Sequence, residues 1–131
     1  RMLSSQSIED IMNTIEKLTT TVIGKDPQKW RNFTSHYSRV FSTSQLDFDR
    51  QLNLIIIWLQ GAYKLRQNLV SGFERTGLHS RMTSFNEKFP NANIYKIILC
   101  IEEVKSLARQ NLYMPLILLN MLLDIQELIY E

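Results

Sequence analysis

The last forty or so residues carry the strongest hydrophobic pattern in the chain. Residues 91–110 place apolar side chains at helical spacing, which predicts an amphipathic helix. Residues 115–130 predict a second helix that is apolar on most of its circumference. Its polar residues Asn120, Asp124 and Glu127 share one narrow stripe at about 100° per residue. Such a helix needs cover on most sides, from its own domain, from a partner protein, or from both.

The same spacing predicts further helices upstream, over residues 7–23, 27–41 and about 44–68. A short helix with Met82, Phe85 and Phe89 facing inward follows, and Pro90 ends it. Short links favour antiparallel neighbours. The sequence therefore predicts an all-α fold, a single antiparallel helical bundle of about five main helices plus a short connecting helix, over residues 1–131.

Helix caps support these boundaries. Asp26 precedes Pro27, a capping residue followed by proline in the first turn, and Ser7 and Asn93 are further candidate caps. Asn111 can adopt the left-handed conformation that ends a helix. These local signals predict where the helices begin and end.

Length and composition suit one globular domain. The chain has 131 residues, 44% of them hydrophobic, and only four glycines and three prolines, which argues against a turn-rich β architecture. A net charge of +2 does not by itself indicate a nucleic-acid partner.

The apolar run 114–123 is interrupted at Asn120 and is shorter than the roughly 20 residues that span a membrane. We therefore expect a cytoplasmic protein without a membrane segment. Because the chain begins at Arg1, we expect a fragment of a longer subunit.

Candidate chemistry is sparse. His36, His79 and Cys100 are isolated in the sequence, and no metal-ligand spacing or phosphate-binding glycine loop occurs. Cys100 lies on the apolar side of its predicted helix, so inert packing is the simplest interpretation. The lone cysteine also excludes an internal disulfide. We expect no enzyme activity, no cofactor and no metal ion.

One group of basic residues suggests an alternative. Arg75, Arg81 and Lys88 could cluster, with Phe73 and Phe85 among them, and basic residues interleaved with aromatics can bind nucleic acid. The competing interpretation is a solvated face over core phenylalanines, which the small net charge favours. These three residues are the candidate nucleic-acid patch.

Three segments of the sequence carry a family resemblance. They are the run from Asn93 to Val104 with Glu102-Glu103 near its middle, the run Leu107 to Asn111, and the leucine-rich run Leu116 to Leu123. Together with Ile57-Trp58-Leu59 and Arg66 to Leu69, they resemble the C-terminal collar domain of the delta-prime subunit of bacterial DNA polymerase III clamp loaders. One departure is visible: the family often has proline where Met114 stands, and here Pro115 follows one residue later.

The resemblance implies a function as well as a fold. It implies a non-catalytic helical domain whose last helices join those of gamma/tau and delta subunits in a closed collar. The complex would act in DNA replication, with DNA contacted only indirectly by this domain. In this family, delta-prime is usually the subunit that does not hydrolyse nucleotide. Nucleotide-binding and lid domains would precede the segment.

The last predicted helix has two apolar stripes. We expect one of them to face the core of the domain and the other to face a partner protein. Leu118, Leu122, Ile125 and Ile129 form a stripe distinct from that of Leu116, Leu119 and Leu123. Trp58 lies off the main stripe of its own helix, so it could pack on a neighbouring helix or on another subunit. We name Leu118, Leu122, Ile125, Ile129 and Trp58 as candidate subunit-interface residues, although the pattern does not decide which stripe faces the core. An alternative is a helical adaptor, unrelated to replication, that binds a partner helix in a groove.

Overall fold

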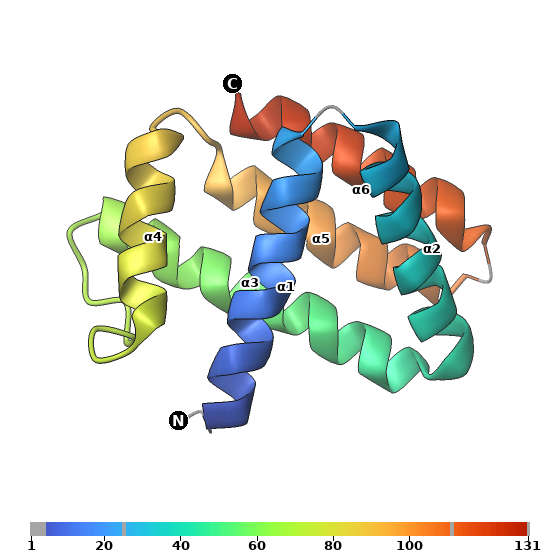
Figure 1. Ribbon diagram of the computed structural model, residues 1–131, viewed down its shortest axis with the longest axis horizontal. Coiled ribbons are helices and arrows are strands. Elements are labelled where there is room, and N and C mark those ends of the chain that lie inside the picture. Colours follow the sequence, from blue (N-terminus) through green and yellow to red (C-terminus); the bar gives the residue numbers. More distant parts are fainter. Residues whose placement is uncertain (1–4, 25, 111, 131) are drawn as a thin grey trace.

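The computed structural model describes residues 5–24, 26–110 and 112–130, which form six α-helices (Figure 1). They are α1 (Ser5–Ile23), α2 (Pro27–Thr43), α3 (Gln45–Arg66), α4 (Gly77–Lys88), α5 (Ile94–Ala108) and α6 (Met114–Ile129). No strand occurs in the described ranges, so the all-α prediction is confirmed.

Two polar side chains set the boundaries of α2 and α3. The Asp26 carboxylate accepts a hydrogen bond of 3.0 Å from the N–H of Gln28, as its position before Pro27 predicts. The Ser44 hydroxyl accepts a 3.2 Å hydrogen bond from the N–H of Asp47. Ser44 is therefore both the end of α2 and the cap of α3, and it is the only residue between them.

Other boundaries follow the sequence less closely. The Asn93 amide oxygen accepts from the N–H of Lys96 at 3.1 Å, so this predicted cap is confirmed. Helix α1 begins at Ser5 and therefore includes Ser7, which the sequence placed at the cap. The stop predicted at Asn111 lies outside the described residues.

Helix α3 is slightly shorter than predicted, and a structured loop follows it. Asn68 adopts a left-handed conformation with φ of 58°, which is incompatible with continuing the helix. The Glu74 carboxylate then accepts from the N–H groups of Ser71, at 2.7 Å, and Gly72, at 3.1 Å. Partial desolvation of Glu74 raises its pKa, but hydrogen bonds from the Ser71 hydroxyl and these amides outweigh that effect and lower it overall.

The six helices form two crossing sets. Helices α3, α5 and α6 lie side by side, with α5 in contact with both neighbours. Helix α1 crosses this layer steeply, α2 packs against α3 and α6, and α4 packs on one end of α3 (Figure 1). This arrangement differs from a bundle with all axes aligned. A single linking residue, Ser44, is too short for the two- to five-residue loop typical of antiparallel helix hairpins, so α3 turns away from α2.

Helices α5 and α6 do form an antiparallel pair, as the short link between them predicts (Figure 1). The N–H of Asn93, which caps the start of α5, donates a 2.9 Å hydrogen bond to the carbonyl oxygen of Leu128 at the end of α6. This pair carries the segments 93–104 and 116–123 of the family resemblance, whereas residues 57–59 of the same resemblance lie on α3.

Arg66 joins the end of α3 to the α4–α5 connection. Its guanidinium donates hydrogen bonds to the carbonyl oxygens of Phe89, Pro90 and Ala92 and to the side-chain oxygen of Asn86. An arginine presents five donors in a fixed planar fork, which suits a group of converging carbonyls. The interaction fixes where α5 begins relative to α3.

One apolar core runs through the described helices. Helix α1 buries one apolar stripe, Ile11, Ile15, Leu18 and Val22. On α2, Phe33 and Tyr37 are buried with their rings 4.7 Å apart, whereas Trp30 is only partly covered. Within the described ranges, no helix has both the length and the apolar character that a membrane crossing requires.

Candidate protein interface

The stripe of α6 that we named as a candidate interface belongs to the core. Leu118 and Leu122 are 0% exposed, and Ile125 and Ile129 are also buried. Helices α5, α2 and α1 all pack against α6, and together they cover this side of it. These four side chains therefore hold the fold of the chain itself, and a partner cannot reach them in the folded state.

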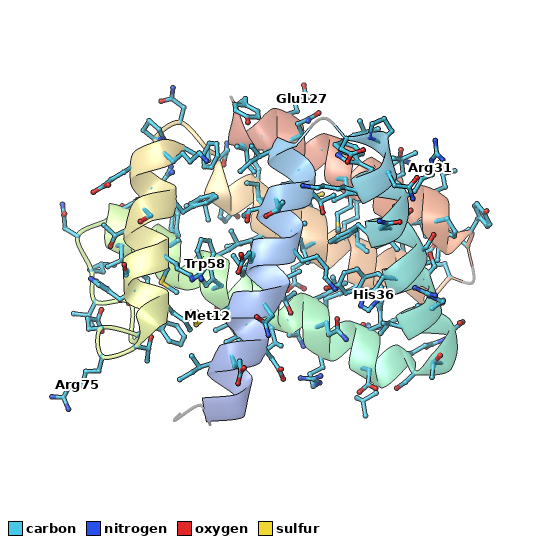
Figure 2. All side chains as sticks on the ribbon, viewed as in Figure 1. Met12, Arg31, His36, Trp58, Arg75 and Glu127 are labelled. Atoms are coloured by element: carbon cyan, nitrogen blue, oxygen red, sulfur yellow. The ribbon has the colours of Figure 1, made fainter. Side chains whose placement is uncertain are left out.

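Trp58 is likewise internal. Its side chain lies toward α4 in Figure 2, and its ring meets that of Phe85 edge-to-face with centroids 5.2 Å apart. The indole N–H has no hydrogen-bond partner among the described residues, although it is buried. Of the two positions that the sequence left open for Trp58, a neighbouring helix of the same chain is the one observed.

The second stripe of α6 is exposed. Leu116, Leu119 and Leu123 are 53%, 37% and 48% exposed, at spacings of three and four residues that place them in a row on one helix face. Isolated exposed leucines are ordinary on protein surfaces, but a contiguous row beside hollows is typical of a binding surface. We call this row the outer leucine stripe.

A groove of about 630 Å³ borders the outer leucine stripe on the α2 side. Leu116 and Leu119 form one wall, and Trp30 and Pro27 at the start of α2 form the other. The Trp30 indole N–H donates to the carbonyl oxygen of Gly24 at 3.3 Å, so the ring is held in place while part of it stays exposed. The groove therefore offers a fixed aromatic wall to an apolar partner.

A second, larger groove of about 1350 Å³ lies along α5 and α6 on the other side of the outer leucine stripe. Its apolar lining comes from Leu99, Leu123, Leu128 and Tyr130. Its charged lining consists of Glu103, Asp124 and Glu127 against a single cation, Lys96, which gives a local net charge of −2. Figure 2 shows Glu127 on the outer side of α6. The groove combines an apolar floor with an acidic rim.

Cys100 lies in this α5–α6 groove and is half-buried. Burial raises the pKa of its thiol to about 11, and the nearby carboxylates of Asp124 and Glu103 contribute to the same shift. A thiol with a raised pKa is a poor nucleophile at neutral pH. The geometry thus favours a packing role for Cys100 over covalent chemistry.

The two histidines and Cys100 lie on three different helices. No group of three or more histidine, cysteine or acidic side chains there could hold a metal ion. His36 lies on α2 and His79 on α4, whereas Cys100 lies on α5. The most developed feature of the surface is therefore the outer leucine stripe with its two grooves.

The candidate nucleic-acid patch lies on α4 and the loop before it. Arg75 precedes the helix, and Figure 2 shows it pointing away from the helices. Arg81 pairs with Glu16 of α1, with an N–O distance of 3.6 Å, and the Lys88 ammonium lies 5.6 Å from the centre of the Phe89 ring. Arg81 and Lys88 are seven residues apart, which places them on the same face of α4, and a shared binding surface for the three residues stays a prediction.

Sequence reasoning missed the role of Arg66 and did not favour the position that Trp30 has. Aromatic side chains recur at helical spacing on α2, at Trp30, Phe33, Tyr37 and Phe41, which favours core packing over a ligand groove. In the structure, Trp30 lies at the wall of a groove. Arg66 binds backbone carbonyls more than twenty residues away, and such acceptors leave no pattern in a sequence. The polar N–H of the indole ring was the one signal in the sequence that could have indicated a partly exposed position for Trp30.

Comparisons with known proteins add no relative: no family model matches the chain, and no match was found among curated proteins or solved structures.

Proposed function

We propose that this chain is a non-catalytic assembly domain that binds another protein through the outer face of α6. The observation that carries the proposal is the outer leucine stripe, Leu116, Leu119 and Leu123, which stays exposed although α6 is otherwise packed. Fully burying one leucine side chain contributes about 1.5–3 kcal/mol. Three partly exposed leucines can therefore decide whether two proteins associate.

The α5–α6 groove defines the chemistry of the partner. Its apolar floor suits the leucine or aromatic face of an amphipathic helix, and its rim carries Glu103, Asp124 and Glu127. Like charges across an interface cost energy, whereas complementary charges align the partners and speed their encounter. The partner is thus a helix with an apolar stripe flanked by lysine or arginine residues.

The resemblance to the delta-prime collar domain gives this partner an identity. We propose that it is the helical collar of a gamma/tau or delta subunit of a bacterial clamp loader, in the cytoplasm. The antiparallel α5–α6 pair supports the proposal, because the resembling segment 116–123 carries the outer leucine stripe, and Leu99 of the resembling segment 93–104 is exposed as well. In this proposal, the domain is one member of a ring of helical collar domains.

The test is co-elution of the purified 131-residue chain with gamma/tau and delta collar domains from the same organism. We expect a heteromeric complex on size-exclusion chromatography with light scattering. The double variant Leu119→Asp/Leu123→Asp should lose the complex while keeping its helical circular dichroism, because both side chains are exposed. The matched control is Leu46→Asp/Leu69→Asp, which changes two exposed leucines outside α6 and should still bind.

Two results would count against the proposal in different ways. A helical wild-type chain that binds neither collar domain would contradict the clamp-loader assignment. Self-association that depends on Leu119 and Leu123, without binding to a collar, would instead support an adaptor unrelated to replication. Equal behaviour of the two double variants would show that the outer leucine stripe is not the binding surface.

A further inference from the structure

A third groove, of about 620 Å³, lies between α1 and α2 and has a different chemical character. Its lining is largely polar, with Asn13 and Thr20 from α1 and Asn32 from α2. Three cations also line it, Lys17 from α1 and Lys29 and Arg39 from α2. Figure 2 shows His36 between the two helices, in the same groove.

The positive charge of this groove is poorly compensated. The one carboxylate in the lining is Glu16, which pairs with Arg81 of α4 at 3.6 Å. Within the described ranges, Lys17, Lys29 and Arg39 form no ion pair with a carboxylate. Like charges brought together by a fold repel each other, and a bound anion relieves that repulsion.

The pKa of His36 is affected by the same positive charges. Its partial burial lowers its pKa, and the charges of Lys17 and Arg39 lower it further. Both of these residues are therefore close enough to influence the centre of the groove. Lys17 and Arg39 are distant in sequence, and the α1–α2 hairpin brings them to one site.

We infer that the α1–α2 groove binds the sugar–phosphate backbone of a single-stranded nucleic acid. Lysine, arginine and asparagine side chains are the usual partners of phosphate oxygens. Ten residues separate Lys29 from Arg39, a rise of about 15 Å along the helix, so the cations follow a line and not a point. A line of cations fits a polyanion better than a single anion.

The line of cations suits a single strand, because its extended backbone can follow a positively charged groove. Asn32 also has donors available: its amide oxygen accepts from Gln28 at 2.9 Å, and its N–H₂ group has no partner among the described residues.

An acidic protein segment fits the same groove less well. Protein partners bind through apolar anchors in addition to charges, and aromatic side chains dominate such contacts. The phenyl ring of Phe33 in the groove wall is only 2% exposed, and the other ring there is the polar imidazole of His36. A backbone of sugars and phosphates needs charges and hydrogen-bond donors alone, and the groove supplies these.

The test is fluorescence anisotropy of labelled oligothymidylate and oligouridylate strands of about twelve nucleotides with the 131-residue chain. Three phosphate contacts predict that affinity falls about 10-fold when salt rises from about 50 to about 150 mM, since each contact to a single strand contributes a slope of about −0.7. Binding of either strand supports the inference, and the ratio of the two affinities distinguishes DNA from RNA as the source of the backbone.

A pair of matched triple variants locates the site. Lys17→Gln/Lys29→Gln/Arg39→Gln should weaken binding about 10-fold or more, because three phosphate contacts are lost. The control changes the same residue types and the same charge elsewhere on the surface, at exposed positions outside both this groove and the candidate nucleic-acid patch: Lys64→Gln, Lys96→Gln and Arg109→Gln in one chain. Its affinity should stay within about twofold of the wild type, because diffuse charge contributes little beyond a Debye length.

Three outcomes would overturn the inference. One is the absence of binding to either strand at about 50 mM salt, where phosphate contacts are strong. Another is equal weakening in the two triple variants, which would show attraction to overall charge. The third is tighter binding of a short oligoglutamate peptide than of either strand, which would assign the groove to an acidic protein. Circular dichroism of each variant confirms that these exposed substitutions leave the helices intact.

Discussion

The two stripes of α6 differ in use although they are nearly identical in composition. Leu118 and Leu122 are fully buried under α1, α2 and α5, whereas Leu119 and Leu123, each one residue further along, are 37% and 48% exposed. A shift of one residue rotates a side chain by about 100° around a helix, which separates the core from the surface. The comparison teaches that an excess of leucine in one helix can serve folding on one side and association on the other.

The largest expected effect is on the free energy of unfolding. Leu122→Ala should reduce it by about 2–5 kcal/mol, because it removes buried contacts and leaves a cavity. The matched variant Leu123→Ala should change it by less than about 0.5 kcal/mol, since it alters a largely solvated position. Urea denaturation followed by circular dichroism measures both. Similar losses in the two variants would remove the distinction between the stripes.

The next prediction, of intermediate size, concerns the alkylation rate of Cys100, whose side chain is half-buried. The pKa of its thiol is raised from 9.0 to about 11, so the thiolate is scarce below that pH and grows as pH rises towards it. Near pH 8 the thiolate fraction of the folded chain should be about 100-fold lower than that of the unfolded chain. Iodoacetamide alkylation followed by mass spectrometry should therefore be slow until denaturant is added.

The contrary result at Cys100 is also clear. An alkylation rate in the folded chain within about threefold of the denatured rate would show a thiol exposed to solvent and free of the carboxylates. The α5–α6 groove would then be more open than its geometry implies. The rate for the Leu122→Ala variant gives an internal reference, because loss of core packing should increase exposure of Cys100.

Local signals in the sequence predicted the helices well, because caps act over a few residues. Asp26 and Asn93 cap the helices that they were expected to cap, and Asp26 with Pro27 leaves little freedom in how α2 begins. The all-α class follows from the same periodicity. The crossing of α1 over the α3–α5–α6 layer did not follow, since it depends on packing between segments that are distant in the sequence.

The surface was harder to predict than the helices, for physical reasons. The buried stripe of α6 consists of leucine and isoleucine and the outer one of leucine, so hydrophobicity alone could not decide which one the other helices cover. The α1–α2 groove was missed because Lys17 and Arg39 come together only in the hairpin. The candidate patch of Arg75, Arg81 and Lys88, in contrast, was suggested by nearness in sequence, and whether the three side chains act together stays a prediction.

The most direct test of the outer leucine stripe is methyl NMR of the leucine-labelled chain during titration with a gamma/tau collar domain. We expect the methyl resonances of Leu116, Leu119 and Leu123 to shift or broaden, because they would enter the interface. Those of Leu118 and Leu122 should keep their positions, because the core is already complete. Changes at Leu118 and Leu122 without changes on the outer leucine stripe would contradict the division of roles within α6.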